Sequence, residues 1–227
     1  MTRTAGRSRG PRLQDRIIEL IHEQRLAPGA TLPTEPQLMD LLGASRNSVR
    51  EAVRALQALG IVEIRHGTGT FVGEAPLAVL KPSLTFQLRS RARALADLVA
   101  VRELLEVGLI AEVAGTIPPR RLDELDALAA RMADDPDADR AFHALLYSSC
   151  GNELVLQLVD LFWSACHEAG AALAPADDPA ERVVADHRAV VGALRTGDAD
   201  AARAAMRRHF TEVRDRVSRA LPADGAD

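Results

Sequence analysis

The stretch Ser45–Gly60, SRNSVREAVRALQALG, divides its residues between two faces of one predicted helix. At ~100° per residue the polar residues share one ~100° sector, and they are Arg46, Asn47, Arg50 and Arg54. The opposite side carries the aliphatic residues Val49, Ala52, Val53, Leu56 and Leu59. Arginine pairs bidentately with the guanine edge, and arginine and serine both hold phosphates. The pattern fits a helix that reads double-stranded DNA, although a solvated charged face on any amphipathic helix looks the same.

Two further helices are predicted ahead of this stretch. Apolar residues at helical spacing over Leu13–Arg25 predict the first helix, which Pro28-Gly29 stops. The segment TEPQ (34–37) has capping-box spacing and opens a short helix that Gly43 ends. Ser45 then caps the polar-edged helix. A short helix, a tight turn and a polar-edged helix are the parts of a helix-turn-helix.

The residues after Gly60 predict a β-hairpin. Residues 61–64 (IVEI) and 70–72 (TFV) have the composition of strands, and GTG (67–69) is a turn between them. We expect Arg65 and His66 at the tip, where glycine lets the backbone approach a phosphate or a groove. A hairpin directly after a helix-turn-helix favours DNA binding over a merely solvated face.

These motifs, in this order and spacing, resemble the winged-helix signature of the GntR family of bacterial transcription regulators. The resemblance covers about residues 13–73 and rests on PG (28–29), LPTE (32–35), SR (45–46), VREA (49–52) and GTGTFV (67–72). It implies that DNA is contacted by Ser45, Arg46, Asn47 and Arg50 from the helix and by His66 and Gly67 from the hairpin, or wing. Family members carry a basic, DNA-contacting residue where this sequence has Pro36. The resemblance therefore implies one missing contact and a different operator preference.

The rest of the chain is predicted to be helical, because no alternating strand pattern follows Val72. Helices are expected over residues 94–115, 118–133, 138–150, 152–173, 179–195 and 198–219. Breaks fall at Pro118-Pro119, Asp135-Pro136, Gly151-Asn152, Pro175 to Pro179 and Gly197-Asp198. Six helices with short connections predict an antiparallel bundle. The expected fold is mainly α: an N-terminal winged helix-turn-helix over residues 1–75, a linker over 76–93 and a C-terminal all-α antiparallel helical bundle over 94–222.

Three histidines of this bundle fall near the apolar edges of their predicted helices. His143 lies four residues after Asp139, so the two side chains lean the same way. His187 precedes Val190-Val191, and His209 precedes Phe210. Imidazole and carboxylate ligands suit zinc, nickel, manganese or iron, and bundle cores commonly hold such sites. Half-buried packing histidines give the same pattern, so the residues alone leave both interpretations open.

Further motifs along these helices resemble the FCD effector domain of the FadR branch of the family. They are RELLE (102–106), Asp139-x-x-Phe142-His143-x-x-Leu146, Asn152, Asp186-His187, Gly197-Asp198 and Met206-x-x-His209. The resemblance implies a divalent metal, zinc first with nickel or manganese as alternatives, and its ligands would be Asp139, His143, His187 and His209. His167 is not at a ligand position and is interpreted as a surface or packing residue.

The same resemblance implies that residues 94–222 form an effector-binding and dimerisation domain. Arg102 and Asn152 would line the site of a small carboxylate effector, although Arg102 could simply pair with Glu106 one helical turn away. The segment between Leu122 and Asp139 is shorter than is usual in the family, which predicts a compact, six-helix version of the domain.

Composition excludes several other classes of protein. Of the 227 residues, 47% are apolar and 26% are charged, which is typical of a globular protein. No apolar run reaches the ~18 residues of a membrane span, and no apolar signal core follows the basic N-terminus. The two cysteines, Cys150 and Cys166, form no disulfide framework and fit a reducing cytoplasm.

Charge divides the chain in the same way as the motifs. Residues 1–75 hold 10 arginines against 8 acidic residues, a net charge of +2, and residues 76–227 hold 18 basic against 24 acidic residues, a net charge of −6. The imbalance indicates two modules with different partners. The basic segment 1–12 is either a phosphate-contacting arm or a solvated end.

The sequence thus predicts a cytoplasmic, ligand-responsive transcription regulator that is not an enzyme. We expect a homodimer that binds a palindromic operator and acts as a repressor. Two alternatives stay open: a metal-dependent enzyme, since a metal with open positions could activate a substrate, and a pure metal-sensing regulator. The enzyme alternative leaves the DNA-binding module unexplained.

Overall fold

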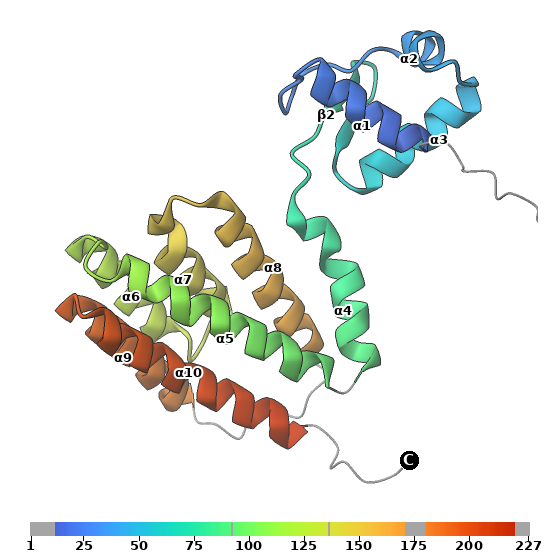
Figure 1. Cartoon of the computed structure of the whole chain (residues 1–227). Coiled ribbons are helices and arrows are strands. Elements are labelled where there is room, and N and C mark those ends of the chain that lie inside the picture. Colours follow the sequence, from blue (N-terminus) through green and yellow to red (C-terminus); the bar gives the residue numbers. More distant parts are fainter. Residues whose placement is uncertain (1–11, 92, 136, 171–179, 221–227) are drawn as a thin grey trace, which may run out of the picture. The chain divides into compact units, whose positions relative to one another are not determined.

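The computed structural model (Figure 1) describes residues 12–91, 93–135, 137–170 and 180–220, which belong to two compact units, Met1–Val79 and Leu80–Asp227. Most of the basic N-terminal segment and the expected break from Pro175 to Pro179 lie outside the described residues.

The first unit is a winged helix-turn-helix, as predicted. It consists of α1 (Leu13–Glu23), α2 (Glu35–Leu42), α3 (Arg46–Ala58) and a two-stranded antiparallel hairpin of β1 (Val62–Arg65) and β2 (Gly69–Val72). The hairpin pairs Val62 with Val72 and Arg65 with Gly69. Its core lies between the three helices and includes the fully buried Ile17, Leu38, Val49 and Leu56.

Local sequence features begin and end these helices. The Gln37 side chain accepts a hydrogen bond from the Thr34 N–H at 2.8 Å, which is one half of the predicted capping box. Gly43 ends α2 in the left-handed conformation, with φ +58°. Ser45 caps α3, since its Oγ accepts from the Ser48 N–H at 3.3 Å. The turn between α2 and α3 is therefore encoded by a handful of neighbouring residues.

A pair of glycines lets the end of α3 meet the end of the hairpin. Gly60 follows α3 with φ +67°, and the N–H of Gly73, just after β2, donates to the Ile61 carbonyl at 2.8 Å. A Cβ atom on Gly73 would lie 2.0 Å from the Gly60 carbonyl oxygen. Only glycine allows this approach, which sets the wing against the helix that precedes it.

The second unit contains seven α-helices within its described residues. They are α4 (Lys81–Ser90), α5 (Ala94–Val113), α6 (Pro119–Arg131), α7 (Asp137–Tyr147), α8 (Glu153–Gly170), α9 (Ala180–Thr196) and α10 (Ala199–Ala220). Short 3-10 turns over Leu77–Leu80 and Ser148–Cys150 precede α4 and follow α7. In this unit α5 packs along α10 and also contacts α4, α7 and α8, whereas α6 and α10 both contact α9 (Figure 1). This is the predicted all-α bundle.

The structure differs from the prediction in the expected linker, residues 76–93. Ten of these residues form α4, which packs against α5 and α8, so the bundle has one helix more than the six expected. Lys81-Pro82, inside this expected linker, begins α4, since proline is compatible with the first turn of a helix, where its missing N–H has no partner to lose. Thr85 and Leu88 are buried on the inner face of α4.

None of the helices in the described ranges combines the length and the apolar character that a membrane-spanning segment requires.

The packing of α4 can be tested with a matched pair of variants. Leu88 is buried in the core of the second unit, whereas Phe86, on the same helix, is 72% exposed. We expect Leu88→Ala to lower the free energy of unfolding of this unit by about 2–5 kcal/mol, because it leaves a cavity. Phe86→Ala should change it by less than about 0.5 kcal/mol. Urea unfolding followed by the emission of Trp163, the one tryptophan of the chain, reports on this unit. Equal effects of the two variants would mean that α4 does not pack as described.

Candidate metal centre and DNA-facing helix

The predicted DNA-contacting residues of α3 and of its N-cap are all exposed. Ser45, Arg46, Asn47 and Arg50 are exposed. The opposite face of α3 is buried through Val49, Ala52, Val53 and Leu56. Arg50 is only loosely held, since its Nε lies 3.5 Å from Oε1 of the exposed Glu35 in α2. An exposed ion pair of this kind contributes little, so Arg50 is free to exchange Glu35 for another partner.

The hairpin turn presents His66 and Gly67 to solvent. Both are exposed, and Gly67 adopts φ +74°. Arg65, expected at the tip, is instead the last residue of β1, where it pairs with Glu63 at 2.8 Å and lies over the Phe71 ring at 4.3 Å from its centroid. These contacts hold the Arg65 guanidinium beside the turn.

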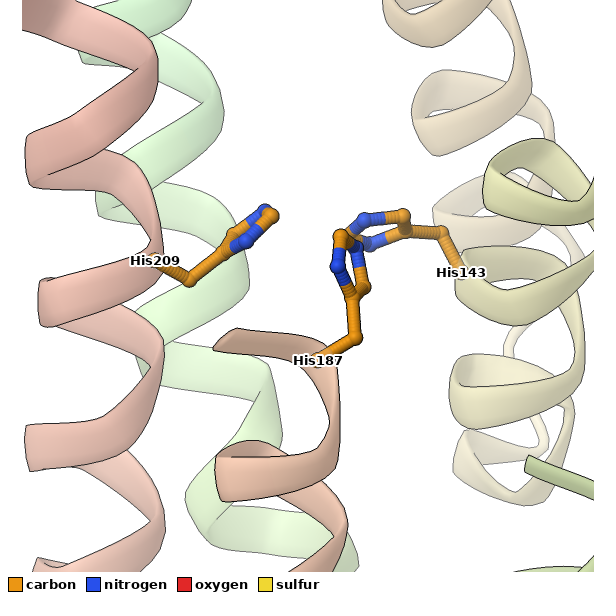
Figure 2. Close-up of side chains that lie close together, drawn as sticks. All are labelled: His143, His187 and His209. Atoms are coloured by element: carbon orange, nitrogen blue, oxygen red, sulfur yellow. The ribbon is translucent and has the colours of Figure 1, made fainter. Parts of the chain in front are cut away.

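Three of the predicted metal ligands meet inside the second unit. His143 from α7, His187 from α9 and His209 from α10 are buried, and one ring nitrogen of each lies within 4.8 Å of the others. Figure 2 shows the three imidazoles pointing toward one another from separate helices. The sequence separation between them makes this convergence a product of the tertiary fold.

The fourth predicted ligand, Asp139, adjoins two of these histidines. Its Oδ1 lies 3.1 Å from Nε2 of His187 and 3.4 Å from Nε2 of His143, and its Oδ2 accepts a hydrogen bond from Nε1 of Trp163 at 2.5 Å. The Asp139 side chain is 36% exposed, whereas the side chains of His143 and His187 are almost fully buried. Solvent therefore reaches the group on its Asp139 side.

The described side chains fit a divalent cation. Nδ1 of His187 lies 2.8 Å from the Val183 carbonyl oxygen and must donate to it, which leaves Nε2 unprotonated in the neutral ring and facing Asp139. Neither ring nitrogen of His143 has a hydrogen-bond partner of good geometry among the described residues, although Nε2 faces Asp139 and Nδ1 faces Glu106. Unprotonated imidazole nitrogens beside a carboxylate are the donor set that zinc, nickel or manganese takes.

Glu106 is a member of the site that the sequence interpretation did not include. This fully buried carboxylate on α5 places Oε2 2.6 Å from Nδ1 of His143 and Oε1 3.1 Å from Nη2 of Arg102. The Tyr147 hydroxyl donates to the main-chain carbonyl of Glu106 at 3.3 Å. Glu106 follows Arg102 by four residues, so the Arg102–Glu106 pair could be expected from the sequence. No sequence signal shows that His143 of α7 packs on the same carboxylate.

These charges determine the protonation of the site. Burial raises the pKa of Glu106, but the neighbouring charges of His143 and Arg102 outweigh burial and hold that pKa below its usual value. Burial lowers the pKa of His143, yet the Glu106 and Asp139 carboxylates raise it overall, so a metal ion bound at Nε2 would take the place of a proton. Burial and the charges of His187 and His143 lower the pKa of His209, which is therefore neutral. Burial raises the pKa of Asp139, but the adjacent imidazoles of His143 and His187 outweigh burial and hold that pKa well below its usual range.

The remaining predicted residues occupy different environments. Arg102 is buried, and its Cζ lies 5.5 Å from the centroid of the Phe210 ring. Asn152 is exposed, and its Oδ1 caps α8 by accepting from the N–H groups of Leu154 and Val155 at 3.1 and 3.3 Å. The structure thus gives Asn152 a capping role at the start of α8. His167 is exposed and stacks on Trp163, with ring centroids 4.8 Å apart.

Comparison with known proteins agrees with this architecture. Residues 11–72 match the family described as "Bacterial regulatory proteins, gntR family", and residues 97–212 match the FCD domain. The HTH-type transcriptional regulator LutR of Bacillus subtilis is 30% identical over 88% of this chain and 96% of its own length. The putative L-lactate dehydrogenase operon regulatory protein of Escherichia coli is 29% identical over 90% of this chain and 84% of its own.

Among solved structures, Streptococcus agalactiae GntR aligns with a TM-score of 0.62 at 29% identity, covering 89% of this chain and 97% of that one. Each unit matches one family, and the relatives align along most of their length. These matches establish the family of the chain. It belongs to the GntR family of bacterial regulatory proteins, with an FCD domain after the DNA-binding domain, and is a transcription regulator and not an enzyme.

Proposed function

We propose that this regulator is a repressor that holds a divalent metal ion in its FCD domain and releases its operator when a small carboxylate binds there. The observation that carries the proposal is the convergence of Asp139, His143, His187 and His209 from three helices of the FCD domain. A ligand that joins this group contacts several helices at once. Its binding therefore biases the arrangement of the whole bundle.

Zinc is the metal that we expect, with nickel or manganese as alternatives. The three histidines and Asp139 would hold it, and a bound metal would supply a Lewis-acidic position that a carboxylate can occupy. His143 and His187 have the orientation for this task, since Nδ1 of each already faces an oxygen of Glu106 or Val183. Ligand histidines in metalloproteins are usually oriented through the second ring nitrogen in this way.

Arg102 is the residue that we propose to pair with the effector. Burial lowers the pKa of Arg102, but the Glu106 carboxylate outweighs burial and raises it overall. Glu106 contacts both Arg102 and His143, so the guanidinium lies one residue away from a proposed metal ligand. A guanidinium pairs bidentately with a carboxylate. Asn152, which caps α8, is a weaker candidate, and we retain it only as an expectation from the resemblance.

Dimerisation would bring two copies of the DNA-facing helix to the two halves of a palindrome. The outer face of α5 favours a homodimer, because Leu104 is 79% and Val101 49% exposed. An apolar helix face of this kind is commonly covered by a partner. Binding to chromosomal DNA also requires the cytoplasm, which is where we place the protein. An effector would release the operator by disfavouring the spacing of the two DNA-binding domains that fits the palindrome. A free energy of coupling between effector binding and operator binding of about 1–3 kcal/mol is enough to change operator occupancy.

A pure metal sensor is the second candidate. The Arg102 guanidinium is already paired with Glu106, and this observation favours a site without an organic effector. In that case the metal alone would change operator affinity, and no carboxylate would alter it further.

The DNA-facing helix is tested by Arg46→Ala and Arg50→Ala. Each should weaken binding by about 1–3 kcal/mol, since an arginine that reads a base edge contributes that much. The probe is a duplex that the wild-type protein selects from a random library, titrated by fluorescence anisotropy at fixed salt. Arg188→Ala, which removes an exposed arginine of the FCD domain, is the control for net charge. Wild-type affinity in both α3 variants would exclude this helix as the reading element.

The metal site is tested by His187→Ala with His167→Ala as its matched control. Both variants remove an imidazole, but only His187 faces the other ligands. We expect His187→Ala to lose stoichiometric zinc and the thermal stabilisation that zinc gives, about 2.7 kcal/mol at a hundredfold excess over Kd. His167→Ala should keep both. Zinc content by atomic emission and melting temperature with and without chelator measure the outcome, and full zinc content in His187→Ala would refute the ligand assignment.

The effector role of Arg102 is tested by Arg102→Met in a thermal-shift screen. The probes are small carboxylates, with L-lactate first because a relative is named for an L-lactate dehydrogenase operon. An active carboxylate should stabilise the zinc-loaded wild type, and Arg102→Met should weaken that response about tenfold or more, as expected for loss of a charge-assisted pair. A response that survives in Arg102→Met would reassign the pairing residue.

A further inference from the structure

We propose that Glu106 is a positioning residue that sets the tautomer of His143 for metal binding, and that Arg102 determines which oxygen of Glu106 is left to do so. The inference rests on the proposed metal site. It assigns to the Arg102–Glu106 pair, expected from the sequence as a plain ion pair, a role in the metal-binding chemistry.

The two oxygens of Glu106 face two different groups. Oε1 accepts from Nε and Nη2 of Arg102 at 3.2 and 3.1 Å. Oε2 lies 2.6 Å from Nδ1 of His143, a distance typical of an ion pair, although neither atom makes a hydrogen bond of good geometry. The carboxylate and the imidazole are both almost fully buried. Arginine has only donors to offer, so Arg102 requires an acceptor at Oε1.

This arrangement specifies the protonation of His143. A carboxylate oxygen at Nδ1 favours a proton on Nδ1, and in the neutral ring Nε2 is then unprotonated. Nε2 is the nitrogen that faces Asp139, at 3.4 Å. Glu106 therefore points the metal-binding lone pair of His143 toward the other ligands, as outer carboxylates do for ligand histidines in general.

The Glu106→Gln substitution tests whether Arg102 determines which side-chain atom at this position faces His143. A carboxylate has two acceptor oxygens, whereas an amide has one oxygen and one NH₂ group. If Arg102 retains the oxygen, the NH₂ group faces Nδ1 of His143, which must then accept. The ring proton moves to Nε2, where it blocks the metal. Removing Arg102 frees the amide to turn its oxygen toward His143 and restores the productive tautomer.

The experiment compares zinc affinity in Glu106→Gln, Arg102→Met, Arg102→Met/Glu106→Gln and Glu103→Gln, by competition with a chromogenic chelator. Zinc alone is the probe, so no effector is needed. Glu103 is the matched control, because it lies on the same helix and pairs with Arg214 at 2.7 Å. Emission of Trp163, which donates to Asp139, gives a second readout of zinc binding.

We expect Glu106→Gln to weaken zinc binding about 10- to 100-fold, the usual effect of removing an outer partner of a ligand histidine. The double variant should recover most of this loss, and Glu103→Gln should bind like the wild type. A merely structural ion pair predicts the opposite order, with the double variant as weak as Glu106→Gln or weaker.

Three results would overturn the inference while leaving the metal site intact. They are wild-type affinity in Glu106→Gln, no recovery in the double variant, or an equal loss in Glu103→Gln. If Glu106→Gln does not fold, the double variant is compared with Arg102→Met, and a tenfold weaker affinity in the double variant also refutes the inference. A wild-type chain that binds no zinc refutes the proposed function itself, which separates the two failures.

Discussion

A line of charge crosses the interior of the FCD domain, from Arg102 through Glu106 and His143 to Asp139. An ion removed from water is stable only when its partners are in place, and breaking such a line leaves an uncompensated buried charge. The four residues come from two helices, α5 and α7, and a third helix adds His187 to the end of the line. The relative positions of these helices are therefore tied to the state of the charges between them.

The same line of charge would make the proposed site respond both to a metal ion and to a carboxylate. A metal at the histidines would place positive charge at one end, and a carboxylate paired with Arg102 would place negative charge at the other. Each ligand would act on Glu106, which contacts both Arg102 and His143. Ligands that share a buried carboxylate are coupled, and such coupling is reciprocal.

The chain connects this interior to the DNA-binding domain through α4. This helix follows the hairpin after a short 3-10 turn, and it packs on α5, which carries Arg102 and Glu106, and on α8, which carries Trp163. Most of the segment expected to be a linker is thus part of the second compact unit. A change in the arrangement of α5 and α8 acts directly on the helix that leads to the wing.

The sequence by itself determined the winged helix-turn-helix, because its signals are local: a capping box at residues 34–37, a left-handed glycine at 43, a serine cap at 45 and an amphipathic stripe along α3. It also supplied the four metal-ligand candidates through family resemblance. It missed α4, whose residues were expected to belong to a linker, and it missed Glu106 as a member of the metal site, because its neighbour His143 is 37 residues away. Only the tertiary structure decided that α7 packs on α5, and hence that the glutamate of an expected Arg–Glu pair also lies against a histidine, because contacts between distant segments depend on how helices pack and not on spacing along one helix.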